Sequence, residues 1–112
     1  MLTEHQIGPD VFTALAGEWD TLAGQSITDT PFQTLAYQRA WWRHLQPPDA
    51  TLHTITARTH DGRLAAIGCF FIVDGCLHFN GCVEETDYLD LIVRPEDAEA
   101  GWTAVLQRLL QP

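Results

Sequence analysis

Three polar residues near the C-terminal end have the types and spacing that could support chemistry. Asp87 precedes, and Tyr88 and Asp90 lie within, the stretch 88–93, which has the composition of a β-strand. Because side chains two residues apart on a strand share a face, Tyr88 and Asp90 are expected to project together. A phenol beside a carboxylate can orient an acceptor amine or hydroxyl, or exchange a proton with it. The structural alternative is that both aspartates face solvent and Tyr88 packs on a helix.

A second group of residues has the ligand types of a metal site. Cys76 and His78 are two apart on a predicted strand and share a face, and Asn80 and Cys82 can extend that line. A structural zinc site takes four ligands, and this spacing matches no zinc ribbon or finger. A cysteine in a strand more commonly behaves as a small buried apolar residue. We therefore expect no metal, and keep a small metal-binding domain built on Cys76, His78 and Cys82 as the weakest interpretation.

The composition restricts the partners. The chain has 112 residues, the size of one small domain, and a formal net charge of −9 with only six basic residues. Nucleic acids and anionic membranes attract basic surfaces, so neither is expected as a partner. The first ten residues lack the basic and apolar regions of a signal peptide, and no apolar run is long enough to span a membrane. With three cysteines and no CxxC pair, the chain is expected to be reduced, soluble and cytoplasmic.

The first predicted helix begins near Asp10, a plausible N-cap, and ends near Gly24. Its apolar residues recur at intervals of three and four, which marks one buried face of a helix. These residues are Phe12, Leu15, Trp19 and Leu22.

The second predicted helix covers residues 35–45. Thr34 can cap its first turn, and Pro47-Pro48 prevents its continuation. Adjacent helix residues diverge by about 100°, so the two tryptophans of this helix need not share an environment. Trp41 is expected in the core, whereas Trp42 is either buried as well or exposed as an interface anchor.

Residues 51–59, 64–73 and 76–81 are predicted to form three strands of an antiparallel meander. Asp61-Gly62 and Asp74-Gly75 separate them. An Asp-Gly pair between apolar runs is a strong signal for a type I′ hairpin, since both central residues of that turn need positive φ. The middle strand is apolar on both faces and is therefore expected at the centre of the sheet.

A fourth strand, residues 88–93, is predicted to lead into a final helix whose first turn contains Pro95. The apolar residues of this helix predict one buried stripe formed by Trp102, Val105, Leu106, Leu109 and Leu110. The expected order is α-α-β-β-β-β-α. The fold class is therefore α+β, with helices packed on a mostly antiparallel sheet.

This order of elements, together with four segments, resembles the first part of a GNAT-type acyltransferase fold. It looks most like the N-terminal half-module of CelD-like and FemAB-like acetyltransferases. The segments are EWDTLAGQS (18–26), PFQTLAYQRAWWRHL (31–45), DGRLAAIGCFFI (61–72) and GCVEETDYLDLIV (81–93). Proteins of that family usually continue well past this point. The resemblance thus implies a single module over residues 1–112 that lacks the C-terminal strands of a complete GNAT unit.

In a GNAT fold, the turn between the fourth strand and the next helix binds the pyrophosphate of acyl-CoA. Its pattern is Arg or Gln, two residues, Gly, one residue, then Gly or Ala, so that backbone amides and a basic residue meet the phosphates. In RPEDAEAG (94–101), Pro95 lacks an amide donor, and Glu96, Asp97 and Glu99 place carboxylates where the phosphates would lie. We expect these acids to cap and charge the helix N-terminus instead. No cofactor is expected on this chain alone, although the parent family uses acetyl-CoA or another acyl donor.

The resemblance therefore implies an acyltransferase-like module without its own pyrophosphate turn. Such a module would be a structural or acceptor-binding part of a larger or oligomeric acyltransferase, and the chain alone is expected to be inactive. Asp87, Tyr88 and Asp90 are the substrate-binding candidates, and no catalytic residue is assigned. The alternative, from a different class, is a stand-alone protein-interaction module that works through an exposed sheet edge.

The expected partner follows from the last strand. After the final helix, a GNAT fold adds a fifth strand beside the fourth. Without it, residues 88–93 would form a bare apolar edge, and such edges pair with other chains. We therefore expect either a homo-oligomer or a missing C-terminal segment as the partner.

Overall fold

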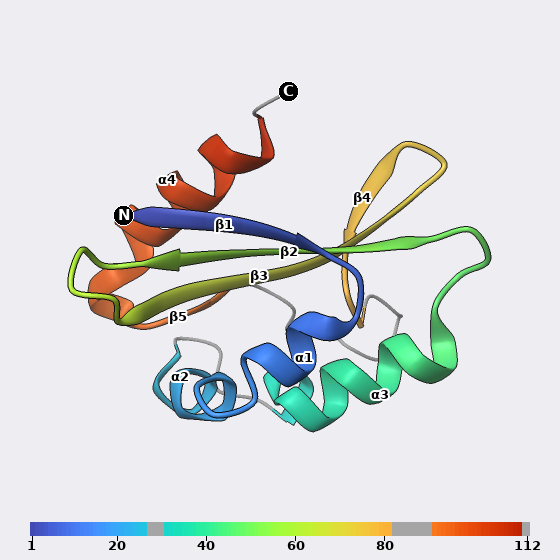
Figure 1. The fold of residues 1–112 in the computed structure, drawn as a ribbon, viewed down its shortest axis with the longest axis horizontal. Helices are drawn as coiled ribbons and strands as arrows, with labels where there is room; N and C mark the ends of the chain where they lie inside the picture. The colour runs from blue at the N-terminus through green and yellow to red at the C-terminus, as the bar shows by residue number, and fades with distance from the viewer. Residues whose placement is uncertain (27–30, 82–90, 111–112) are drawn as a thin grey trace.

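A computed structural model describes residues 1–26, 31–81 and 91–110, which form an α+β fold with an antiparallel sheet of five strands and four helices (Figure 1). The strands are β1 (Leu2–Ile7), β2 (Thr51–Arg58), β3 (Leu64–Val73), β4 (Cys76–Phe79) and β5 (Ile92–Val93). The helices are α1 (Asp10–Ala14), α2 (Trp19–Gln25), α3 (Leu35–Leu45) and α4 (Ala98–Leu109). Two 3₁₀ turns, η1 (Pro31–Gln33) and η2 (Pro95–Asp97), precede α3 and α4.

The sheet has the order β1-β2-β3-β4, and β5 also pairs with β3. Every pairing is antiparallel. β4 and β5 therefore occupy the same edge of β3, at its C-terminal and N-terminal halves respectively. Among the described strands, β1 forms the opposite edge of the sheet.

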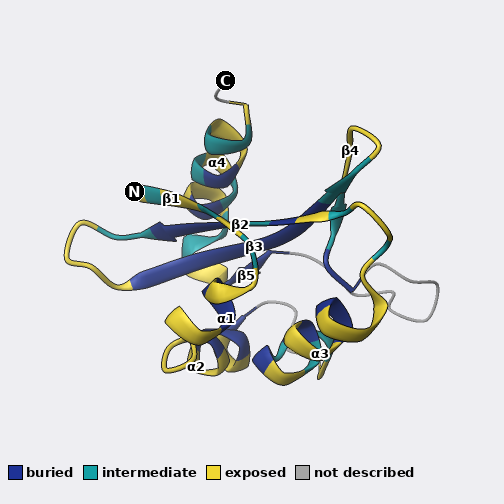
Figure 2. Ribbon diagram, turned by 45° about the vertical axis from the view of Figure 1, so that its right-hand side comes forward, coloured by how far each residue is buried: buried dark blue, intermediate teal, exposed yellow. Residues whose placement is uncertain are grey.

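The central position of β3 is confirmed. Eight of its ten residues are buried, and Figure 2 shows this strand buried along most of its length. One face packs against α1, α2 and α3, and the other packs against α4 (Figures 1 and 2). A strand that is apolar on both faces requires such a layer on each side, because neither face is stable in water.

The hairpin predictions have different outcomes. Asp74 and Gly75 both have positive φ, 52° and 76°, as a type I′ turn requires. In the other hairpin only Gly62 has positive φ, at 90°. That loop is longer, and the register of β2 against β3 shifts at Ala57/Arg58, which is a bulge.

The N-terminal region departs from the prediction in two ways. β1 was not expected, so the predicted order α-α-β-β-β-β-α was wrong at its start. Its sequence, LTEHQI, is exposed or half-buried throughout, so it lacks the apolar alternation by which a strand is recognised. The single helix predicted from Asp10 to Gly24 is two helices, α1 and α2, with a turn at residues 15–18. The predicted buried face is nevertheless correct, because Phe12, Leu15, Trp19 and Leu22 are all buried.

The prediction for α3 is confirmed at both ends. The Thr34 hydroxyl accepts a hydrogen bond from the Tyr37 amide at 3.3 Å.

Trp41 and Trp42 are only 5% and 7% exposed, and both rings lie against Phe71. Trp42 is therefore a core residue, and its role as an exposed interface anchor is excluded.

The predicted buried stripe of α4 is correct in part, because Val105 is buried and Trp102 and Leu109 pack against the same core cluster. Leu106 and Leu110 are 47% and 83% exposed, whereas Gly101 and Val105 are buried. A Cβ atom on Gly101 would lie 3.0 Å from Val93 Cγ2 and 3.2 Å from Ala66 Cβ. The helix thus makes its closest approach to the sheet through a glycine, a contact that apolar periodicity does not reveal.

This close approach predicts that Gly101→Val destabilises the protein. The added methyl groups overlap Val93 and Ala66, and overpacking of this kind costs about 1–3 kcal/mol. Ala100→Val is the matched control, because residue 100 is exposed on the same helix and loses only ~0.5 kcal/mol of helix propensity. Urea unfolding of both variants measures the difference. Equal free energies of unfolding would show that α4 does not contact the sheet at Gly101.

Candidate functional site

The predicted acceptor residues, Asp87, Tyr88 and Asp90, lie outside the described residues. Residues 80 and 91, the described residues on either side of this stretch, have defined positions beside β3. The Asn80 amide donates to the Cys69 carbonyl at 2.9 Å, and the register of β5 places Leu91 opposite Gly68. Residues 80 and 91 therefore stand opposite neighbouring residues of β3, although ten residues separate them in sequence.

A buried polar network holds the first of these flanking residues. The Asn80 side-chain amide donates to both the backbone carbonyl and Oε1 of Gln38, each at 2.9 Å. Gln38 in turn donates to the Phe32 carbonyl at 2.7 Å. Asn80 Oδ1 is buried and has no hydrogen-bond partner within the described ranges, so it can accept from a donor that reaches it. The sequence suggested Asn80 only as an extension of the Cys76 and His78 line.

The second flank does not form the bare apolar edge that was predicted. Leu91, Ile92 and Val93 are all buried within the chain. The Val93 amide donates to the Ser26 hydroxyl at 3.2 Å, so this backbone donor is satisfied by the C-cap residue of α2. The prediction of self-association assumed that the side chains of this strand are exposed, and those of β5 are not. Self-association itself remains a prediction.

The turn before α4 is built around Arg94. Its Nε donates to Gln25 Oε1 at 2.6 Å, and its Nη1 donates to the Leu64 carbonyl at 2.9 Å. Asp97 accepts from Arg63 at 3.3 Å and lies 3.9 Å from Arg94. The side chains of Arg94 and Asp97 are only 12% and 13% exposed. The basic residue of the turn is thus directed into the protein and neutralised there.

The acids of this turn do not act as a side-chain cap. Asp97 stands at the N-cap position of α4 but makes no capping hydrogen bond, because its carboxylate faces the two arginines. Glu96 and Glu99 lie on the outer surface and line a groove. The expected side-chain cap is therefore wrong, whereas the expected negative charge is present, because all three acids lie in η2 or the first turn of α4.

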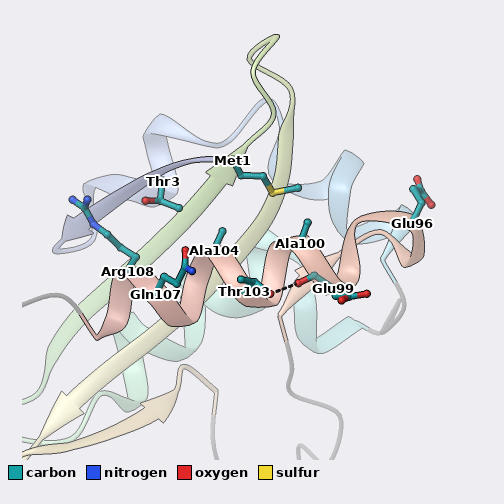
Figure 3. A pocket seen from close by; sticks show the side chains of 9 residues that line it. All are labelled: Met1, Thr3, Glu96, Glu99, Ala100, Thr103, Ala104, Gln107 and Arg108. Atoms are coloured by element: carbon teal, nitrogen blue, oxygen red, sulfur yellow. Dashed lines mark hydrogen bonds between the residues drawn. The ribbon is translucent and has the colours of Figure 1, made fainter.

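The groove lies between β1 and α4 and has a volume of about 700 Å³. Figure 3 shows that the small side chains of Ala100 and Ala104 lie at the middle of the groove. Glu96 lies toward one end of α4 and Arg108 toward the other. The Thr103 hydroxyl donates to the Glu99 carbonyl at 2.9 Å. Sequence reasoning missed this groove because one wall is the unpredicted strand β1. Its polar lining consists of the Glu96 and Glu99 carboxylates, the Arg108 guanidinium, the Gln107 amide and the hydroxyls of Thr3 and Thr103.

Two histidines meet across β1 and β2. His5 Nε2 and His53 Nδ1 are 2.8 Å apart, a hydrogen bond in which one ring must donate and the other accept. Burial, followed by the charge of His5, lowers the pKa of His53 below its ordinary value. Protonation of both rings would remove the acceptor and place two positive charges together.

The histidine pair predicts a loss of stability in acid. The pKa of His53 is lowered in the folded state, so the unfolded state binds the proton more readily as the pH falls below the ordinary value of 6.5. The free energy of unfolding, measured with urea, is expected to be smaller at pH 5.5 than at pH 7.5. His53→Gln should reduce this difference, and His44→Gln, on the exposed surface of α3, should not. The same pH dependence in all three proteins would remove His53 as its source.

The proposed metal ligands do not converge where the structure describes them. Cys76 is exposed, and the His78 ring stacks on Phe71 with centroids 5.1 Å apart. Cys82 lies outside the described residues. Within residues 1–26, 31–81 and 91–110, no three potential ligands gather around one point.

Burial raises the pKa of the Cys69 thiol to about 12, against the opposing effect of the hydrogen bond from Thr54.

The cysteines are therefore expected to differ in reactivity. The thiolate is the nucleophile, so iodoacetamide at pH 8.5 should alkylate Cys76 at least about tenfold faster than Cys69 in the folded protein. Peptide mapping assigns each site. In urea the two rates should become similar, which controls for local sequence. Rapid labelling of Cys69 without denaturant would contradict its burial.

Comparison of the chain with protein-family models, curated proteins and solved structures found no match. Among the described helices, none has the length and apolar character needed to span a membrane.

Proposed function

We propose that this chain is an acyltransferase-like, GNAT-related module without its own acyl-CoA pyrophosphate turn. It serves as the structural or acceptor-binding part of a larger or oligomeric cytoplasmic acyltransferase. The proposal rests on the resemblance of the four segments and on an α+β arrangement in which an antiparallel sheet leads through a short turn into α4. The donor of the complete enzyme is acetyl-CoA or another acyl donor.

The state of Arg94 is the observation that carries the proposal. A pyrophosphate turn needs free backbone amides and an available cation. Here Pro95 has no amide hydrogen, and the Arg94 guanidinium already bonds Gln25, Leu64 and Asp97. An incoming phosphate would have to displace these partners and approach the surface carboxylates nearby. The turn supports packing of α4 more than binding of an anion.

The acceptor part of the proposal concerns Asp87, Tyr88 and Asp90. Residues 80 and 91, which precede and follow the stretch that contains them, lie at the β3 edge, where Asn80 forms its buried network. An acceptor amine held by Asp90 and Tyr88 at this edge would lie close to the strand that bears acyl donors in the resembled fold. Either a second copy or a C-terminal segment would then supply the donor site.

The second candidate is a protein-interaction module, and it is favoured by β1. This strand forms one edge of the described sheet, and Leu2 and Ile7 at its ends are 59% and 66% exposed. A further strand can add to such an edge through main-chain hydrogen bonds. This function would need no acyl donor.

The test introduces the pyrophosphate-binding pattern of GNAT folds into the turn before α4 and measures acetyl-CoA binding by calorimetry. The natural chain is expected to show no saturable binding. Pro95→Ala/Asp97→Gly/Glu99→Ala recreates Arg-x-x-Gly-x-Ala and should bind acetyl-CoA at about millimolar affinity or better. Pro48→Ala/Asp49→Gly/Glu4→Ala makes the same residue and charge changes at exposed positions away from the turn and should not bind.

Saturable binding of acetyl-CoA to the natural chain would show that the Arg94 guanidinium can bind a phosphate despite its present partners. Failure of the restored variant to bind, with its fold intact by circular dichroism, would contradict the acyltransferase-like architecture and leave the interaction module.

A further inference from the structure

Two of the chain's six arginines have no partner among the described residues, whereas the other four are engaged. The engaged arginines are Arg58, Arg63, Arg94 and Arg108. Arg58, for example, makes two contacts of 2.8 Å with Glu18. Arg39 and Arg43 have neither a hydrogen bond nor an ion pair with any residue that the structure describes. In a chain with fifteen acids and a net charge of −9, this lack of partners needs an explanation.

The positive charges of Arg39 and Arg43 lie close enough to repel each other. Residues four apart on a helix are neighbours on its surface, so Arg39 and Arg43 place like charges on consecutive turns of α3. Such a like-charged pair weakens a helix. Arg43 lies in the last turn, where the helix dipole favours a cation, but Arg39 has no such support. The pair therefore leaves two guanidinium groups available to an anion that no described residue provides.

The two arginines border a hollow of about 300 Å³ between α1 and α3. Its lining is formed by Pro9, Phe12, Thr13, Arg39, Trp42, Arg43 and Gln46. Phe12 and Trp42 belong to the core and are held by its packing, so they give the hollow a rigid aromatic and apolar floor. The Gln46 side chain is fixed by a 3.0 Å hydrogen bond to the Trp42 carbonyl. The size is at the lower end of small-molecule sites.

We propose that this hollow binds a small organic carboxylate whose body is flat and apolar. The planar guanidinium presents donors that match a carboxylate, and two such groups at the rim favour a charged head over a neutral one. The apolar body lies against Phe12, Pro9 and Trp42, where it loses contact with water. This site is separate from the acceptor segment and does not depend on the acyltransfer proposal.

The test is a titration of the ¹⁵N-labelled chain followed by NMR, with benzoate as the probe. Benzoate is expected to shift the Trp42 indole N–H signal in a saturable manner. Benzamide, which has the same ring without the charge, and inorganic phosphate, which has charge without the ring, should each bind at least about tenfold more weakly. Higher salt should weaken benzoate binding, since the rim is exposed to solvent.

Arg39→Gln/Arg43→Gln should weaken benzoate binding about tenfold or more. Arg63→Gln/Arg108→Gln has the same change in net charge away from the hollow and should bind benzoate as the natural chain does. Both pairs lie on the surface, and well-dispersed spectra establish that each variant is folded.

Equal weakening by the two variants, or equal affinity for benzoate and benzamide, would overturn the proposal. Phosphate binding as tight as benzoate binding would also overturn it, because the site would then recognise charge alone.

Discussion

The burial of β3 on both faces is the constraint on which the rest of this fold depends. A strand with apolar side chains on alternating faces is stable only between two layers. α1, α2 and α3 supply one layer and α4 supplies the other. Close packing on the α4 side requires glycine at two points, Gly68 beside the Phe70 ring and Gly101 against Val93. The helices of both layers thus share the task of covering this strand.

Polar groups join these layers at defined places. The Trp19 indole donates to the Gln33 carbonyl, and Asp20 accepts from the Leu35 amide, both at 2.9 Å, so α2 fixes the start of α3. Arg94 connects the turn before α4 to both α2 and β3. Buried polar groups that are paired in this way specify one arrangement of the helices on the sheet. The same pairing withdraws Arg94 from binding.

The surfaces that remain for recognition lie around the perimeter of the core. β1 offers an edge with which no other described strand pairs, and it forms one wall of the groove along α4. α3 offers two arginines above an apolar hollow. The edge of β3 that holds Asn80 offers one buried acceptor atom without a partner among the described residues. Each surface has a different chemistry, so an extended peptide, a small carboxylate and an acceptor amine would not compete for the same place.

The sequence by itself determined the elements whose signals are local. Alternation and composition located β2 and β3, and Thr34 and Pro47 bounded α3. The Asp74-Gly75 pair predicted its type I′ turn because aspartate and glycine tolerate positive φ. Of the candidate site, the sequence supplied only residue types. Only the tertiary structure decided that an edge strand precedes α1, that Trp42 is buried, that Gly101 faces the sheet and that Arg94 points inward. These features depend on contacts between residues far apart in the chain, and such contacts leave no periodic pattern in the sequence.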